Sequence, residues 1–141
     1  MTSGDCRVIV DSSAVIAILF EEPEERPFIS AIYAAARSRI SAANFLEAAI
    51  VIDSARSPVS SRRLDDLMQR TQLVIEPVTE EQAHIARDAY RDYGKGSGHP
   101  ARLNFGDCFA YALARTTGEP LLFKGDDFIH TDIAPAIKET P

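Results

Sequence analysis

The stretch Arg-Val-Ile-Val-Asp at residues 7–11 decides the fold class of this chain. Its three central residues are β-branched and apolar with no polar alternation, a pattern typical of a short strand that is buried on both faces. The strand ends at Asp11, where Ser12 or Ser13 can cap a helix that follows over residues 14–20. A buried strand that leads at once into a helix is the first unit of a parallel α/β sheet.

The same alternation of strands and helices continues through the chain. Further strands are predicted at residues 39–41, 73–77 and 121–123, with at most one more short strand in residues 128–137. Further helices are predicted from residue 23 or 27 to 36, over 44–55, from 57 onward, from 79 to 93, and from 104 to 117. The pattern predicts an α/β fold with a parallel central β-sheet flanked by helices, formed as a single domain over residues 1–141.

Charge and cysteine usage narrow the classes of function. The formal net charge of −6 argues against a broad basic surface for nucleic acid, although it does not exclude a nucleic-acid substrate at a local site. Cys6 and Cys108 form no CxxC pattern, so a zinc site is unsupported. The beginning of the chain does not read as a secretory signal, and no apolar run is long enough to cross a membrane. A cytoplasmic location and no membrane partner are therefore expected.

Several acidic residues stand in or beside sequence that should form the core. They are Asp11, Glu47, Asp107 and the adjacent pair Asp126 and Asp127. Each has a structural reading, such as a helix cap or a turn residue, but a carboxylate near a core is costly unless its charge is compensated. Acids at the carboxyl ends of parallel strands meet at the same edge of the sheet. Because Mg²⁺ and Mn²⁺ prefer oxygen ligands, the acids together suggest a divalent-cation site.

Three segments carry a resemblance to a known family. Residues 8–14 look like the opening of PIN domains, and residues 93–114 and 120–128 are similar to the VapC branch of that family, together with Thr-Asp-Ile at residues 131–133. The VapC proteins are ribonuclease toxins of toxin–antitoxin pairs, and their fold is a parallel sheet wrapped by helices. The resemblance therefore implies a PIN-like domain with ribonuclease activity.

The resemblance also implies roles for individual acids. Asp11, Glu47 and Asp107 would be the catalytic acids that hold the metal, which is expected to be Mg²⁺ with Mn²⁺ able to substitute. Side chains of adjacent residues diverge, so only one of Asp126 and Asp127 should complete the site; we favour Asp126 as the fourth catalytic acid, with Asp127 as the alternative. Water activated at the metal would attack the RNA phosphodiester in line, leaving a 5′-phosphate and a 3′-hydroxyl.

Two further residues are candidates for contact with substrate. Arg102 lies in the loop that leads into the proposed site and could bind an RNA phosphate. Ser13 could orient a water at the metal, although capping of the helix is the simpler role. The substrate implied by the resemblance is an RNA, either transfer RNA or ribosomal RNA.

The partners are likewise implied by the resemblance. A homodimer is expected, together with inhibition by a VapB antitoxin made from the neighbouring gene. Part of the first two helices would form a groove for a helix of the antitoxin. The apolar residues in question are Ile16, Leu19, Phe20, Phe28 and Ile32, and the sequence does not separate groove from core at each of them.

Other functions remain open as alternatives. A phospho-accepting receiver module would need a pair of acids after the first strand and an acceptor aspartate after a central one, but Ser12 and Ser13 follow Asp11, and Ile40-Ser41 offers no acceptor. A phosphatase of the haloacid dehalogenase type would need an acid where Ser13 stands. A catalytically silent PIN-like module that only binds a partner is opposed by the acids at every expected segment.

Overall fold

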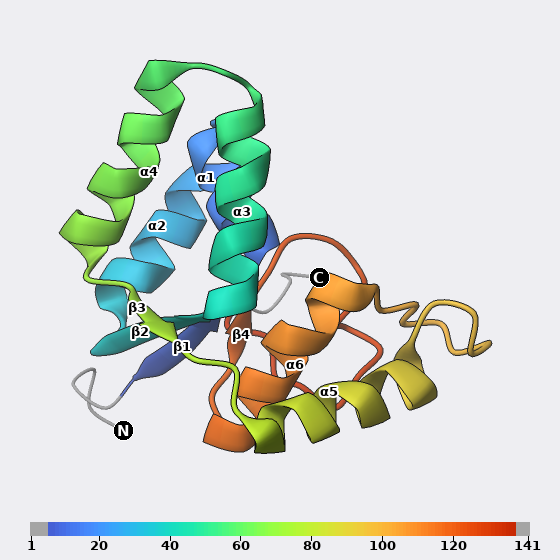
Figure 1. Ribbon diagram of the computed structural model, residues 1–141. Coiled ribbons are helices and arrows are strands. Elements are labelled where there is room, and N and C mark those ends of the chain that lie inside the picture. Colours follow the sequence, from blue (N-terminus) through green and yellow to red (C-terminus); the bar gives the residue numbers. More distant parts are fainter. Residues whose placement is uncertain (1–5, 138–141) are drawn as a thin grey trace.

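The computed structural model describes residues 6–137, which fold around one four-stranded sheet (Figure 1). The strands are β1 (Arg7–Val10), β2 (Arg37–Ser41), β3 (Val74–Glu76) and β4 (Leu121–Leu122). Their order across the sheet is β3-β2-β1-β4, and every neighbouring pair is parallel. The predicted α/β class with a parallel central sheet is therefore confirmed. The ends of the predicted domain, residues 1–5 and 138–141, lie outside the described residues.

Six helices are described in the same part of the chain. They are α1 (Ser12–Leu19), α2 (Glu25–Ala34), α3 (Ala42–Ser54), α4 (Pro58–Thr71), α5 (Glu80–Tyr93) and α6 (Phe105–Thr117). The expectation that Ser12 or Ser13 caps the first helix was wrong, because the side chain of Asp11 is the N-cap and accepts from the Ser13 N–H. Helix α6 ends as expected at Gly118, whose φ of 70° lies in the left-handed region that suits glycine.

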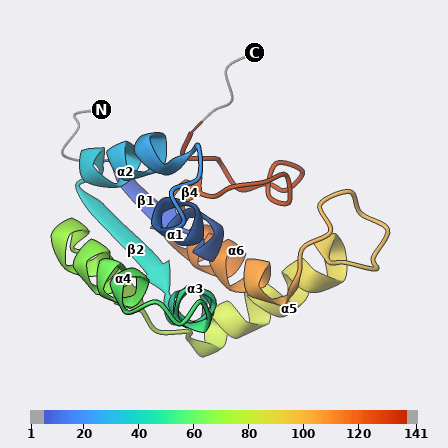
Figure 2. The same cartoon turned by 90° about the horizontal axis from the view of Figure 1, so that it is seen from above.

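The helices cover both faces of the sheet because the buried side chains of β1 alternate in direction. Val8 and Val10 pack with residues of α1–α4, whereas Ile9 packs with residues of α5 and α6. Figure 1 shows α1–α4 on one side of the sheet and α5 and α6 on the other. Figure 2 shows α1 in the middle of its layer, between α2 and α3. The continuous apolar run of β1 thus contributes side chains to the hydrophobic core on each face of the sheet.

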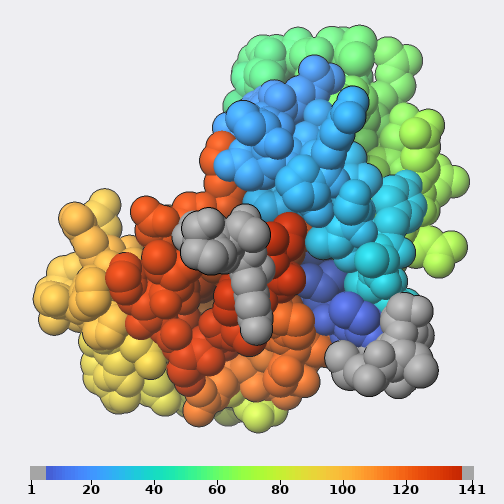
Figure 3. Space-filling view, turned by 180° about the vertical axis from the view of Figure 1, so that it is seen from behind, coloured from blue at the N-terminus to red at the C-terminus, as the bar shows by residue number. Residues whose placement is uncertain are grey.

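The carboxyl ends of β1 and β4 lie side by side and lead into the site described below. The Asp11 N–H donates to the Leu122 carbonyl at 2.9 Å, which fixes the end of β1 beside β4. Beyond β4 the chain returns, and Leu121 pairs in parallel with Pro135 in the isolated bridge that stands where a further short strand was anticipated. Seen from behind, residues 118–137 lie across this side of the molecule (Figure 3). Within residues 6–137, none of the helices has the length and apolar character needed to cross a membrane.

Candidate acidic active site

Asp11 is a buried carboxylate held at the junction of β1 and α1. Its side chain is 2 % exposed, and Oδ2 accepts a hydrogen bond from the Ser13 N–H at 3.0 Å. The other oxygen, Oδ1, is buried and has no hydrogen-bond partner among the described residues. Burial raises the pKa of Asp11 to about 6, and the charge of Glu47 adds to the rise, while hydrogen bonds from Ser13 oppose it. Asp11 therefore caps its helix with one oxygen and leaves the other for a ligand.

Glu47 reaches the same place from α3. Its Oε1 accepts a hydrogen bond from the Ser12 hydroxyl at 2.5 Å, so the first turn of α1 holds the carboxylate. The amide of Asn44, one helical turn earlier on the same face of α3, lies 3.5 Å from the same oxygen. Packing explains part of the apolar character of α3, since Ala48 and Ile52 are buried in the core, but Leu46 and Ile50 on the same helix are exposed.

Asp107 occupies the first turn of α6 and completes a capping box. Its Oδ2 accepts from the backbone N–H of Asn104 at 3.0 Å, and the Asn104 side chain accepts from the Asp107 N–H at 2.9 Å. Burial raises the pKa of Asp107 to about 8; the Asn104 N–H opposes this, and the nearby carboxyls of Asp127 and Asp11 add to it. Asp107 thus has both the predicted structural role in the helix and a place in the acidic site.

The fourth acid of the pocket is Asp127 rather than Asp126. Asp127 lines the same hollow as Asp11, Glu47 and Asp107, whereas Asp126 is exposed and does not line it. The preceding residue, Gly125, has a φ of 103°, so the chain turns sharply between β4 and the paired acids. This turn decides which of two adjacent side chains faces inward, a choice that residue order alone left open.

The acids share one hollow of about 250 Å³ whose wall comes from several elements. Ser13 also lines it, but its hydroxyl accepts a hydrogen bond from the Lys124 N–H at 3.0 Å and so anchors the loop after β4. Arg102 is not brought to the hollow: it is exposed, and its φ of 54° places it in a left-handed turn of the preceding loop. Of the two residues expected to contact substrate, the structure therefore places only Ser13 beside the acids.

The donor set fits a hard divalent cation. Four carboxylates face one small hollow, two of them have raised pKa values, and a buried Asp11 oxygen has no partner among the described residues. A bound cation would offset the cost of burying these charges, which is the main cause of the raised pKa values, and also the smaller repulsion between the acids. Within residues 6–137, however, no three acidic, histidine or cysteine side chains are arranged to hold one ion by themselves.

Two residues that contact Glu47 were not foreseen. Asn44 is fully buried, and its Nδ2 donates to the Gly106 carbonyl at 2.9 Å. Gly106 itself lies directly against the Glu47 carboxylate. The available signal was an amide near the start of an otherwise apolar helix, three residues before the candidate acid. A buried amide needs partners, so its position predicts a hydrogen bond across an interface between elements.

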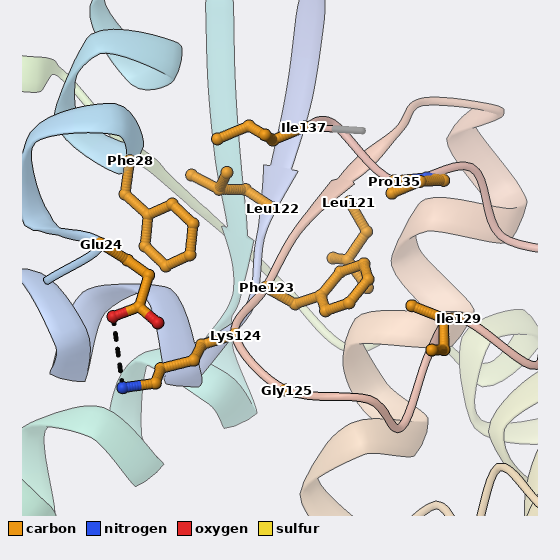
Figure 4. Close-up of a pocket in the computed structure, with 10 residues that line it drawn as sticks. All are labelled: Glu24, Phe28, Leu121, Leu122, Phe123, Lys124, Gly125, Ile129, Pro135 and Ile137. Atoms are coloured by element: carbon orange, nitrogen blue, oxygen red, sulfur yellow. Dashed lines mark ion pairs between the residues drawn. The ribbon is translucent and has the colours of Figure 1, made fainter. Parts of the chain in front are cut away.

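A larger hollow of about 380 Å³ adjoins the site but holds none of the four acids. Figure 4 shows its apolar walls, with Phe28 of α2 on one side and Phe123 and Ile129 of the C-terminal segment on the other. Lys124 stands at its edge and forms an ion pair with Glu24 at 3.3 Å, drawn as a dashed line. The same lysine also pairs with Glu22 at 3.0 Å. These ion pairs direct the Lys124 ammonium to the two glutamates.

Comparisons with known proteins identify the family and support the fold. The sequence profile of the PIN domain family matches residues 8–134. The chain is 55 % identical over 130 residues to the protein named ribonuclease VapC28 of Mycobacterium tuberculosis, covering 92 % of this chain and 98 % of that one. It is 49 % identical over 129 residues to ribonuclease VapC42 of the same organism, with 92 % and 98 % covered. Among solved structures, M. tuberculosis VapC20, described as a sarcin–ricin loop cleaving toxin, superposes with a TM-score of 0.69 at 15 % identity, covering 90 % of this chain and 96 % of that one.

Proposed function

We propose that the four acids of the hollow form the catalytic site of this chain, which belongs to the PIN-domain family and, within it, to the VapC ribonucleases. These are Asp11, Glu47, Asp107 and Asp127. The protein is an endoribonuclease toxin of the VapC type, which hydrolyses RNA phosphodiester bonds and is paired with a VapB antitoxin. The observation that carries the assignment of the site is the meeting of these acids, from four separate segments, in one hollow.

Like VapC ribonucleases generally, the enzyme depends on a divalent metal, and we propose Mg²⁺, with Mn²⁺ able to substitute. When bound, the cation would polarise the phosphodiester, lower the pKa of the attacking water and offset the charge that develops on the leaving oxygen. The protein contributes pre-oriented oxygens. Asp11 is fixed through Oδ2 by Ser13, while its Oδ1 has no partner among the described residues, and Asp107 is fixed through Oδ2 by Asn104.

The RNA is proposed to be a structured transfer or ribosomal RNA, cut in a loop. Support comes from the small, open hollow, which suits a backbone splayed out of a helix better than a continuous duplex. The sarcin–ricin loop cleavage described for VapC20 is consistent with such a substrate but belongs to that protein. Such a role also supports a cytoplasmic location. Sequencing the 5′ ends of cellular RNAs after brief induction would identify the target, and random ends without a common loop would contradict the proposal.

The antitoxin is proposed to bind between α2 and α4. A hollow of about 250 Å³ there is lined by the end of α1 and by Ile29, Tyr33 and Leu67. Charged residues of both signs stand around it, and Arg63 is already paired with Glu21 at 3.1 Å. The sequence left open which apolar residues of the first two helices belong to the groove and which to the core. Leu19, Phe28 and Ile32 are buried, Ile16 is half-buried and Phe20 is exposed. Tyr33→Glu should reduce co-purification of the neighbouring gene's VapB, and undiminished co-purification would rule out this groove.

A homodimer is proposed through the face of α5 and α6 that is turned away from the sheet. An apolar hollow of about 460 Å³ lies there, and the rings of Phe105 and Phe109 pack edge to face beside it with centroids 4.9 Å apart. Phe105 is 77 % exposed, an unusual state for a large aromatic ring that a second copy would relieve. The single PIN domain is proposed to extend over residues 1–141.

The alternative functions receive less support from the same geometry. A receiver module would need an acceptor acid directly after a central strand, but β2 ends at Ser41 and leads into Ala42 and Ala43. A silent binding module would not need to keep buried acids whose pKa values are raised. Acetyl phosphate followed by mass measurement tests the first reading, and calorimetric titration with Mg²⁺ tests the second.

The direct experiment is RNA cleavage by the purified chain with and without Mg²⁺. Asp11→Asn and Asp107→Asn should each lower the rate by more than about 100-fold, because even outer-shell partners of a metal site are worth about 10- to 100-fold. Excess EDTA should abolish cleavage, and added Mn²⁺ should restore it. Full activity of either variant, or in EDTA, would show that the acids do not form the catalytic site.

A further inference from the structure

The carboxylate of Glu47 lies against the backbone of α6 at a position where the helix has no side chain. A methyl group built on Gly106 would stand 2.3 Å from Oε2 and 2.7 Å from Oε1 of Glu47, and Cβ atoms essentially never approach other heavy atoms within 3.0 Å. The three heavy atoms nearest to that methyl all belong to the Glu47 carboxylate. Any residue other than glycine at 106 must therefore displace the acid.

This glycine is not explained by the needs of its helix. Gly106 follows Phe105, the first residue of α6, inside a turn that the capping box of Asn104 and Asp107 already fixes. Alanine is a much better helix former than glycine, so local stability would favour alanine here. The close approach of the Glu47 carboxylate is the feature that requires glycine.

Asn44 joins the two helices at the same point. Its side chain is fully buried, and Nδ2 donates to the Gly106 carbonyl at 2.9 Å while lying 3.5 Å from Glu47 Oε1. The hydrogen bond to the Gly106 carbonyl is the stronger of the two and connects α3 to the first turn of α6. The longer contact with Glu47 places the amide beside the carboxylate. The same oxygen, Glu47 Oε1, also accepts a hydrogen bond from the Ser12 hydroxyl at 2.5 Å.

We propose that Asn44 and Gly106 form a seat for the Glu47 carboxylate and act as positioning residues for the metal site. The seat sets where the Glu47 oxygens stand relative to Asp11 on β1 and Asp107 on α6. The proposal rests on the function proposed above, in which Glu47 belongs to the acidic site. It assigns no contact with metal or RNA to Asn44 or Gly106 themselves.

The test is Gly106→Ala, studied alone and combined with Glu47→Ala. Binding of Mn²⁺ by the RNA-free protein, followed by electron paramagnetic resonance, and the melting temperature are measured for all four proteins. Gly106→Ala should keep or raise the melting temperature but weaken Mn²⁺ binding by about 10- to 100-fold. In the Glu47→Ala background, Gly106→Ala should not weaken Mn²⁺ binding any further, because the carboxylate that the methyl group would displace is absent.

The outcomes distinguish a failure of the positioning role of Asn44 and Gly106 from a failure of the proposed acidic site. If Glu47→Ala weakens Mn²⁺ binding and Gly106→Ala does not, the seat is wrong and the acidic site stands. If Glu47→Ala leaves both Mn²⁺ binding and RNA cleavage unchanged, both proposals fail at Glu47. If Gly106→Ala unfolds the protein in both backgrounds, the methyl group meets something other than Glu47, and the seat is overturned. Unfolding only where Glu47 is present would show that the methyl group meets Glu47, and the Asn44 variants would then provide the test of Mn²⁺ binding.

A second variant tests the amide. Asn44→Leu keeps a similar shape but removes the donor to the Gly106 carbonyl, whereas Asn44→Gln keeps an amide. Asn44→Leu should weaken Mn²⁺ binding even at temperatures at which the variant is fully folded. Asn44→Gln should recover part of this loss. Equal Mn²⁺ binding by the folded fraction of Asn44→Leu and by the wild type would contradict a positioning role.

Discussion

At the scale of single residues, the site depends on carboxylates that each perform two tasks. Asp11 and Asp107 both cap helices through one oxygen and face the shared hollow. The caps restrict their rotamers, so little side-chain freedom remains to be lost when a ligand binds. A residue that is explained by helix capping can therefore also be a functional residue.

The two adjacent acids after Gly125 should differ in their effect on catalysis. Asp127→Asn should reduce RNA cleavage by about 10-fold or more, because it removes a charge from the hollow, whereas Asp126→Asn should leave the rate within about 2-fold. The two variants change the same chemistry one position apart, so each serves as the control for the other. If Asp126→Asn lowered the rate of RNA cleavage more than Asp127→Asn does, Asp126 would be the fourth catalytic acid, as first favoured from the sequence.

The raised pKa values predict how the stability of the metal-free protein changes with pH. The folded-state pKa values of Asp11 and Asp107 are about 6 and about 8, above the ordinary value of 3.8. The folded state thus holds protons that the unfolded state has lost, and the stability contributed by both groups is present at low pH and lost as the pH rises from about 4 to about 8. The melting temperature in EDTA should fall over this range.

Asp107→Asn isolates this effect. The amide oxygen can still accept from the Asn104 N–H, but it does not titrate, so the fall in melting temperature above about pH 6 should be smaller than in the wild type. Saturating Mg²⁺ should flatten the wild-type curve as well, because it favours the ionised acids. Parallel curves for the wild type and the variant in EDTA would mean that Asp107 ionises normally.

At the scale of elements, the first turns of α1 and α6 and the middle of α3 meet where β1 and β4 end. Ser12, Asn44 and Gly106 make the contacts among these helices around Glu47. The geometry of the site therefore depends on how helices from opposite faces of the sheet come together at its edge. Helix α3 belongs to one layer and α6 to the other, yet they touch here.

The capping box of α6 should be measurable as stability. Asn104→Ala removes the acceptor for the Asp107 N–H and should lower the free energy of unfolding by about 1 kcal/mol, the usual cost of a lost N-cap. Asn104→Ser keeps an acceptor and should cost only a few tenths of that. Urea denaturation followed by circular dichroism gives both values. A neutral Asn104→Ala would mean that the first turn of α6 is held by packing alone.

At the scale of the whole molecule, one sheet separates two layers of helices, for which we propose different partners. The layer of α1–α4 contains the groove proposed for the antitoxin, and the layer of α5 and α6 presents the apolar face proposed for the second copy. The acidic hollow lies between them. An antitoxin could therefore bind one layer without disturbing the dimer contact on the other.

The dimer contact can be tested by mass. Phe105→Ser should shift the protein toward the monomer in sedimentation velocity, because it removes the most exposed aromatic ring of the α5–α6 face. Val59→Ser is the matched control: Val59 is 60 % exposed on α4, and its loss should not change the mass. A dimer that survives Phe105→Ser unchanged would place the contact elsewhere.

The sequence by itself determined the parallel α/β fold and the approximate position of each helix and strand, and it singled out Asp11, Glu47 and Asp107 as acids in apolar surroundings. It could do so because burial, periodicity and capping are encoded locally: β1 is a continuous apolar run, and Asn104 and Gly118 mark the ends of α6. Only the tertiary structure decided that Asp127 lines the hollow, that Arg102 does not, and that Asn44 and Gly106 enclose Glu47. These depend on a turn at Gly125 and on contacts between helices far apart in the chain, and no local pattern specifies the direction of a side chain across such an interface.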